Sequence, residues 1–253
     1  MGKSKIDWCD YVWNPVTGCS KVSEGCRNCY AERLAKRFWG ERKFTDVICH
    51  EDRLEYPFSI KKPSRIFVNS MSDLFHEKVS TEFIYKVIRV MLNNPQHQFI
   101  VLTKRPERMR ADVNWMFVYD FPNIIWGVSI EDQKTADERI PFLLETKPLL
   151  KSRHLTVSAE PLLGPVDIQK YLYEIEWVIC GGESGIGARP MHIDWVTSLQ
   201  RQCGLTSTAF FFKQWGEFDA NGVRVGKAAA GHLLNGQEYH EYPRGFLMGE
   251  VEP

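Results

Sequence analysis

The strongest constraint on the fold is a series of short, continuously apolar runs rich in β-branched and aromatic residues. They lie at residues 65–69, 99–103, 124–129, 154–159, 177–181 and 209–213. Their centres are roughly 22 to 34 residues apart, which leaves room for a helix between successive strands and is typical of βα units. Runs that are apolar throughout, rather than alternating, indicate parallel strands covered on both faces.

Helical patterns fill several of the intervals between these runs. Residues 81–92 carry an apolar stripe with a period of about 3.6 residues, and 131–144 and 194–202 carry weaker versions of it. A first strand near 8–13 and a charged helix over 31–39 are expected before the first run. The patterns predict an α/β fold, a partial (β/α)6 TIM-like barrel, with an open doubly wound sheet as the alternative.

The chain divides into a long periodic part and a short irregular one. Residues 1–215 are assigned to the barrel, with a polar excursion over 40–63. Residues 216–253 are Gly-rich and poorly periodic, and they are expected to form a C-terminal extension packed on the same domain.

Charge and apolar patterning exclude several classes of protein. The 32 Lys and Arg residues equal the 32 Asp and Glu residues, which excludes a globally basic nucleic-acid binder but leaves room for a local basic cleft. The chain has no apolar run of about 18 residues, and its first residues lack an apolar signal core. We therefore expect a cytoplasmic protein with no membrane partner.

Three of the seven cysteines lie in one short polar loop, residues 17–30, that leads into the expected helix. They are Cys19, Cys26 and Cys29. Three thiolates that converge on one point form a metal site with one ligand missing, which suggests a cluster whose fourth position is free for a substrate or cofactor. Structural zinc is the alternative, since zinc normally has four protein ligands and Cys9 or Cys49 with His50 could supply the fourth.

Polar or charged groups follow every predicted strand at the point where it ends. Function in a β/α barrel lies at these carboxyl ends. Burying such groups without partners costs about 2–7 kcal/mol each, so one shared polar site explains them better than chance. In chain order the groups are Asn69, Ser70, Ser72 and Asp73, then Lys104 and Arg105, then Ser129 and Glu131, then Glu160, then Gly181, Gly182 and Glu183 with Arg189 close behind, and Lys213.

Several longer motifs together resemble the phage-associated three-cysteine-motif family, which looks like a branch of the radical S-adenosylmethionine (SAM) enzymes. The motifs are GC at 18–19, GCRNCYA at 25–31, FVNSMSDLFH at 67–76, SAEPLLGP at 158–165, GGESG at 181–185 with ARP at 188–190, and FFKQWG at 211–216. The resemblance spans about residues 8–246. Two features depart from the radical SAM pattern: six residues separate the first two cysteines where the usual pattern has about three, and Asn28 replaces the aromatic residue before the last cysteine.

The resemblance implies a cofactor pair and a chemistry. The three loop cysteines would hold three irons of a [4Fe–4S] cluster, and the fourth iron would chelate SAM. One electron from the reduced cluster then cleaves SAM to methionine and a 5′-deoxyadenosyl radical, which abstracts a substrate hydrogen. The electron would come from a reductant protein such as flavodoxin or ferredoxin.

Positions on the rim assign roles to the strand-end groups within this resemblance. Three sets are expected to bind SAM: Asn69, Ser70 and Ser72 at its amino group, Lys104 or Arg105 at its carboxylate, and Ser129 and Glu131 at its ribose hydroxyls. Gly181 and Gly182 would let the backbone approach a bound ligand. Glu160, Glu183 and Lys213, with Arg189, remain for catalysis and substrate contact.

Three functions follow from these features. The first is a radical SAM enzyme with a nucleotide or nucleic-acid base as the favoured substrate, because phages modify their DNA; a partner protein and a host-cytoplasm location would fit a phage protein. The second is a zinc-binding, non-catalytic nucleic-acid-binding module. The third is a metal-dependent hydrolase on a β/α barrel, with a hard metal among Asp73, Glu131, Glu160 and Glu183.

Overall fold

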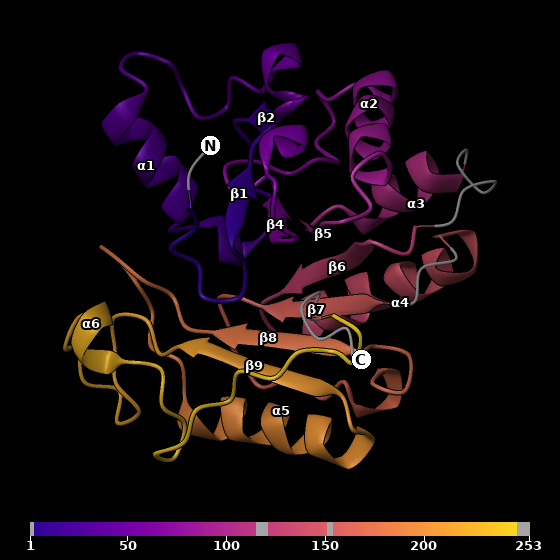
Figure 1. Ribbon diagram of the computed structural model, residues 1–253. Helices are drawn as coiled ribbons and strands as arrows, with labels where there is room; N and C mark the ends of the chain where they lie inside the picture. The colour runs from indigo at the N-terminus through magenta and orange to yellow at the C-terminus, as the bar shows by residue number, and fades with distance from the viewer. Residues whose placement is uncertain (1–2, 115–120, 151–153, 247–253) are drawn as a thin grey trace.

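A seven-stranded parallel sheet forms the centre of the computed structural model, which describes residues 3–114, 121–150 and 154–246 (Figure 1). In spatial order the strands are β1 (Tyr11–Trp13), β4 (Arg65–Val68), β5 (Gln98–Thr103), β6 (Ile124–Ile130), β7 (Leu155–Ala159), β8 (Trp177–Gly181) and β9 (Ala209–Gln214). The two outermost strands, β1 and β9, do not pair, so the curled sheet remains an open half-barrel. All six expected runs are strands, but the predicted number of six strands in the sheet was wrong, because the sheet has seven. The short strand expected near 8–13 joins the same sheet as β1.

Helices connect most successive strands and surround the sheet (Figure 1). They are α1 (Tyr30–Phe38), α2 (Thr81–Leu92), α3 (Pro106–Asn114), α4 (Gln133–Leu150), α5 (Ile193–Thr206) and the short α6 (Lys227–Ala230). The four expected helices are confirmed, with α4 and α5 extending beyond their predicted carboxyl ends. The connection from β7 to β8 holds only a 3₁₀ turn, η4 (Gln169–Tyr171).

The excursion between α1 and β4 folds back on the N-terminal segment. Its strand β3 (Ile48–Cys49) pairs antiparallel with β2 (Val16–Thr17), which lies just before the cysteine loop. Three further 3₁₀ turns complete this region: η1 (Glu24–Cys26), η2 (Glu51–Arg53) and η3 (Tyr56–Ser59). The strand that precedes the cysteine loop is therefore held by a segment that follows the loop in the sequence.

Two hydrophobic clusters cover the two faces of the sheet, and this explains the continuously apolar strands. Along β5, Phe99 and Val101 belong to one cluster, while Ile100 between them belongs to the other. The second cluster also contains Trp8 from the N-terminal segment and Phe246 from the far end of the described chain. Burial on both faces is the pattern expected of a parallel sheet in an α/β protein.

The segment after Trp215 lies along β9. Phe212 N donates to the Tyr239 carbonyl at 2.7 Å, and Glu241 N donates to the Phe210 carbonyl at 3.2 Å. This segment therefore covers an edge strand that would otherwise expose unpaired backbone groups. Residues 247–253 of the expected extension lie outside the described residues.

No helix in the described part of the chain is both long enough and apolar enough to span a membrane.

Candidate functional site

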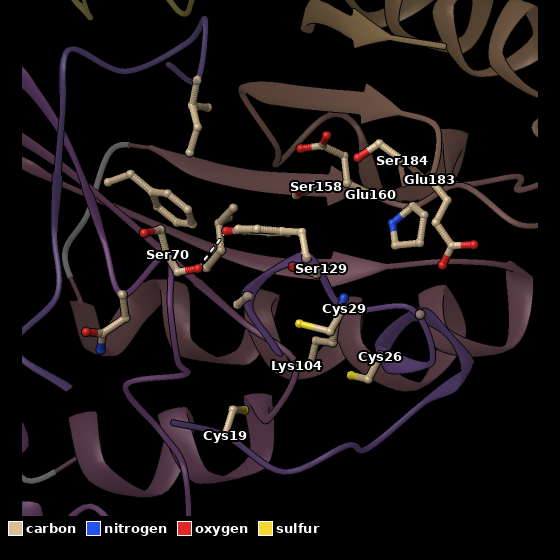
Figure 2. Close-up of a pocket in the computed structure, with 18 of the residues that line it drawn as sticks. Cys19, Cys26, Cys29, Ser70, Lys104, Ser129, Ser158, Glu160, Glu183 and Ser184 are labelled. Atoms are coloured by element: carbon tan, nitrogen blue, oxygen red, sulfur yellow. Dashed lines mark hydrogen bonds between the residues drawn. The ribbon is translucent and has the colours of Figure 1, made fainter. Parts of the chain in front are cut away.

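A cavity of about 500 Å³ opens at the carboxyl ends of the strands (Figure 2). The cysteine loop and α1 line one side of it, and residues that follow the strands of the sheet line the other. Every residue predicted for the site lines this cavity except Glu131 and Gly181, which are buried, and Arg189, which is half-buried outside the lining. The strand ends therefore meet at one place, as the sequence pattern predicts.

The three loop cysteines are half-buried and line the cavity together (Figure 2). No other cysteine and no histidine in the described part of the chain lines it. Three of the remaining cysteines, Cys9, Cys180 and Cys203, are buried, and Cys49 lies on β3.

Burial keeps two of the loop thiols protonated. Burial, reinforced by the negative charge of Asp73, raises the pKa of Cys19 to about 12, and the nearby Arg105 only partly offsets the rise. Burial also raises the pKa of Cys29. Metal binding at these thiols must therefore release protons. Across the residues that the structure describes, no group of three His, Cys, Asp or Glu side chains is arranged around a single metal-ion position.

The beginning of the cysteine loop is held by an arginine after β5. Arg105 Nη2 donates to the Ser20 carbonyl at 3.1 Å and to Ser20 Oγ at 2.9 Å, and Nη1 lies 3.7 Å from Cys19 Sγ. Asp73 Oδ2 lies 3.1 Å from Arg105 Nη1 and also accepts from the Thr103 hydroxyl at 3.0 Å. Because Asp73 is buried and fixed from two sides, it orients Arg105 toward the loop.

The middle of the loop is held by Glu131, of which only 1 % is exposed. Glu131 Oε1 accepts from Ser23 Oγ at 2.9 Å and from Lys104 Nζ at 2.7 Å, while Oε2 lies 3.1 Å from Arg139 Nη1. Gly25 allows this close approach, since a Cβ at that position would lie 2.3 Å from Glu131 Cγ. The loop thus packs on a buried carboxylate that two cations neutralise.

The end of the loop is held by Glu183, which follows β8. Asn28, between the last two cysteines, donates from Nδ2 to Glu183 Oε2 at 3.0 Å. Arg189 Nη2 donates to Glu183 Oε1 at 2.7 Å and to the Glu24 carbonyl at 2.8 Å. Glu183 and Arg189 therefore bind the loop at two points, on either side of Cys26.

We refer to Asp73, Glu131 and Glu183 as the three carboxylate anchors. They follow β4, β6 and β8, which are alternate strands of the curled sheet. Glu131 and Glu183 accept hydrogen bonds from loop residues directly, whereas Asp73 acts on the loop through Arg105. Each is paired with at least one arginine, which satisfies its charge in a buried position. The anchors fix the course of the loop and, with it, the positions of the three thiols.

The helix after the loop is fastened in a similar way. Arg33 donates to the carbonyl oxygens of Ser184 and Ile186, the latter at 3.2 Å. Gly185 between them has φ +91°, a conformation that glycine adopts without strain, and a Cβ there would lie 1.9 Å from Arg33 Nη1. The GGESG motif therefore contacts both the cysteine loop, through Glu183, and α1, through the Ser184 carbonyl.

One ion pair that lines the cavity has no hydrogen bond to the cysteine loop. Lys213 Nζ on β9 lies 2.8 Å from Glu160 Oε1 after β7, and their side chains are 19 % and 17 % exposed. Among the described residues, neither side chain has another hydrogen-bond partner. This pair is available to a molecule bound in the cavity.

Three further polar groups at the cavity lack partners within the described chain. Asn69 is buried and has a left-handed backbone (φ 63°); its Oδ1 accepts from Val16 N at 3.2 Å, and its Nδ2 has no acceptor. Ser129 and Ser158 also line the cavity, and their hydroxyls form no hydrogen bond to any described residue. In contrast, Ser70 is hydrogen-bonded to Asn14, and Ser72 donates to the Val16 carbonyl.

Sequence reasoning did not identify several residues that build this site. Ser20, Ser23 and Asn28 connect the cysteine loop to the anchors, and Arg139 on α4 supports Glu131. For Ser20, Ser23 and Asn28, the available signal in the sequence was their position inside the cysteine loop. Nothing in the sequence pairs Arg139 with Glu131, apart from a spacing of eight residues at the start of a predicted helix.

The anchor Glu183 predicts a pH-dependent stability difference. Burial acts to raise its pKa, but hydrogen bonds from Arg189 and Asn28 outweigh burial and lower it below its usual 4.5. Its stabilising contribution is therefore complete above pH 4.5 and is lost as the pH falls through the lowered native pKa. We expect Glu183→Gln to cost about 1.5–3 kcal/mol at neutral pH and progressively less in acid.

Urea denaturation of both proteins across this pH range measures the difference. Glu145→Gln is a matched control, because Glu145 is half exposed and its one ion-pair partner among the described residues is the exposed Arg110. A difference between wild type and Glu183→Gln that stays constant or grows in acid would show that the Glu183 charge does not stabilise the fold.

Comparisons with known proteins place the chain in a family and beside one group of structures. A family model described as "Protein of unknown function (DUF5131)" matches residues 3–243. No curated protein matches the sequence. A double mutant of spore photoproduct lyase with bound AdoMet and dinucleoside spore photoproduct is similar at a TM-score of 0.48 and 12 % identity, over 85 % of this chain and 58 % of that one. Spore photoproduct lyase complexed with dinucleoside spore photoproduct is similar at a TM-score of 0.45 and 10 % identity, over 79 % of this chain and 62 % of that one. The chain thus spans about three fifths of the length of these structures.

Proposed function

This chain belongs to the DUF5131 family, whose function is unknown, and from its site we propose that it is a radical SAM enzyme with a [4Fe–4S] cluster on Cys19, Cys26 and Cys29. The observation that carries the proposal is that three thiols of one loop line one cavity, with no fourth cysteine or histidine in its described lining. Each thiolate of an iron–sulfur cluster binds its own iron, so the thiols need not meet at a single ion. A fourth iron would be left for SAM.

The chain's own residues would position this cofactor pair. When bound, the cluster and SAM together supply a radical that abstracts a hydrogen atom from a substrate. The three carboxylate anchors hold the loop so that the thiols face the cavity. Trp8, Phe67 and Leu102 give the cavity an apolar part, which limits the access of water to a reactive species.

Groups with free hydrogen-bonding capacity are the proposed SAM contacts. Asn69 Nδ2 and the hydroxyls of Ser129 and Ser158 have no partners of their own in the described chain. Lys104 and Arg105 line the same cavity, so their positive charge faces any carboxylate placed there. Ion pairing to the anchors does not prevent this second role.

The substrate is proposed to contact the Glu160–Lys213 pair. A carboxylate and an ammonium 2.8 Å apart can hold a substrate group that both donates and accepts hydrogen bonds. Lys213 is also placed to donate a proton to a group at this position. Glu183, for which the strand-end position also predicts a catalytic role, is here assigned to the loop through Asn28 and Arg189.

A substitution of Asn69 tests its proposed role. Asn69→Asp keeps an oxygen for the Val16 amide and tolerates a left-handed backbone, but it removes the Nδ2 donor. We expect SAM affinity to fall about tenfold, because a ligand acceptor would lose its donor. The melting temperature should fall as well, since Asn69 is buried and a carboxylate there has, among the described residues, only the Val16 amide as a donor. Isothermal titration calorimetry measures the affinity. Unchanged affinity would place SAM away from Asn69.

The proposal as a whole is tested by SAM binding to cluster-loaded and cluster-free protein. Part of the binding free energy should come from the iron, so calorimetry should show weaker binding when the cluster is absent. Equal affinity in both forms, or none in the loaded form, would indicate an iron–sulfur protein of another kind.

The structure offers less support for the two alternative functions. For structural zinc, two of the three proposed fourth ligands are engaged elsewhere: the Cys9 thiol donates to Ser4 Oγ at 3.1 Å, and His50 Nε2 lies 2.8 Å from Thr17 Oγ1. The third, Cys49, does not line the cavity. For a hydrolase with a hard metal, the needed carboxylates of Asp73, Glu131 and Glu183 are already neutralised by arginine or lysine.

A further inference from the structure

The exposed face of α1 combines arginine with aromatic and apolar side chains. Its members are Tyr30, Arg33, Leu34, Arg37 and Phe38. Spacings of three and four residues place them on one side of the helix. Tyr30, Leu34 and Phe38 are 44 %, 41 % and 67 % exposed, whereas Ala31 and Ala35 of the same helix are buried. We call this surface the α1 face.

The α1 face continues into the cavity. Tyr30, Arg33 and Leu34 belong both to the face and to the cavity lining. The Tyr30 hydroxyl donates to the Ser70 carbonyl at 2.6 Å, which fixes its ring at the entrance while part of the ring remains exposed. A ligand that lies along the helix would therefore reach the site directly.

The positive charges of this region lack acidic partners. Arg33 donates only to carbonyl oxygens, and Arg37 stacks over the Phe38 ring at 5.2 Å without a carboxylate among the described residues. Lys5 and Lys227, which line the cavity with Arg33, likewise form no ion pair within the described chain. Asp7 also lines the cavity, but these unpaired cations outnumber it, although the whole chain is neutral.

The other cations of the helix differ in this respect. Lys36 on α1 and Lys21 in the cysteine loop both pair with Glu32, at 3.0 and 3.1 Å. The unpaired charge is thus confined to the side that carries the aromatic rings and faces the cavity. Arginine beside exposed rings is the combination that binds the phosphates and stacks the bases of a nucleic-acid strand.

We propose that the α1 face binds a single strand of nucleic acid and directs one of its nucleotides into the cavity. For the reaction at that nucleotide, this inference rests on the proposed function. A single strand fits because its bases are free to stack on Phe38 and Tyr30. A nucleotide within a duplex must leave the base stack to reach a recessed site, which costs unpairing energy. The substrate class is then a nucleotide within a strand.

Binding of a fluorescently labelled deoxythymidine oligonucleotide of about 16 nucleotides tests this, measured by fluorescence anisotropy at low salt. We expect the double variant Arg37→Ala/Phe38→Ala to weaken binding at least about tenfold. The slope of log affinity against log salt should fall by about 0.7 for the lost phosphate contact. Both side chains are exposed, so the fold should be unaffected, which circular dichroism checks.

The matched control is Lys134→Ala/Tyr173→Ala, which removes one cation and one exposed aromatic ring outside the α1 face and the cavity lining; their side chains are 81 % and 78 % exposed. The proposal would be overturned if the two double variants weakened binding equally. It would also be overturned if the protein bound a duplex of the same length more tightly than the single strand, or bound no oligonucleotide at low salt. Binding to an acidic protein but not to the oligonucleotide would overturn it as well. The assay needs no cluster, so the two proposals can fail separately. A protein that forms the cluster but does not bind the oligonucleotide would refute strand binding by the α1 face alone. A protein that binds the oligonucleotide but forms no cluster would refute only the proposed radical SAM function.

Discussion

Alanine at any one of the three loop cysteines is expected to abolish the visible absorbance of the reconstituted iron–sulfur cluster, whereas alanine at the other four leaves it intact. Cys19, Cys26 and Cys29 alone among the cysteines line the cavity. Each thiolate binds one iron, so each substitution removes one of the three protein ligands of the cluster. Anaerobic reconstitution followed by absorbance and iron analysis measures the effect.

Cys49→Ala is the sharpest control for this series. Cys49 is half-buried like the loop cysteines, but it lies on β3 and not in the cavity lining. Loss of the cluster in Cys49→Ala and its retention in Cys19→Ala would overturn the ligand assignment. Thermal melting of the cluster-free variants separates a lost ligand from a lost fold.

Glu131→Ala is expected to lower the free energy of unfolding by about 3–5 kcal/mol, the largest stability effect of any single site residue. Glu131 is 1 % exposed, and its removal leaves Arg139 and Lys104 without their shared carboxylate. It also takes away the acceptor of Ser23, so the cysteine loop loses its central contact. Urea denaturation of the cluster-free protein measures the loss.

A second measurement reports on the loop itself. In Glu131→Ala the loop thiols should react faster with an alkylating reagent under native conditions, because the loop can leave its position. Glu138→Ala, on the helix α4 that follows Glu131, is the matched control. Its half-exposed carboxylate lies 3.9 Å from Lys134, so its loss should cost less than about 1 kcal/mol and leave thiol reactivity unchanged. Equal effects of the two substitutions would contradict the anchor role of Glu131.

The strands could be predicted because their signal is local. Six apolar runs became β4 to β9, since burial on both faces demands continuous apolar sequence. The seventh strand, β1, is only three residues long, so its membership in the sheet depends on pairing with β4. Helix α3 escaped prediction because only Met109 and Val113 mark its apolar side within a charged sequence.

The site could be located but not resolved from sequence alone. The rule that function lies at strand ends brought Glu131, Glu183 and Arg105 to the right rim. Their partners Ser23, Asn28 and Ser20 are between 85 and 155 residues away, and no spacing rule connects such pairs. The sequence therefore predicts charged residues at the site but not that several of them hold the cysteine loop.

The central claim is that this cavity holds a cluster that cleaves SAM, and one anaerobic assay tests it most directly. The protein is reconstituted with iron and sulfide, reduced, mixed with SAM and analysed for 5′-deoxyadenosine. We predict about four irons per chain and 5′-deoxyadenosine that appears only with the loaded, reduced protein and never with Cys26→Ala. A protein that stays colourless after reconstitution, or a loaded and reduced protein that leaves SAM intact, would contradict the claim.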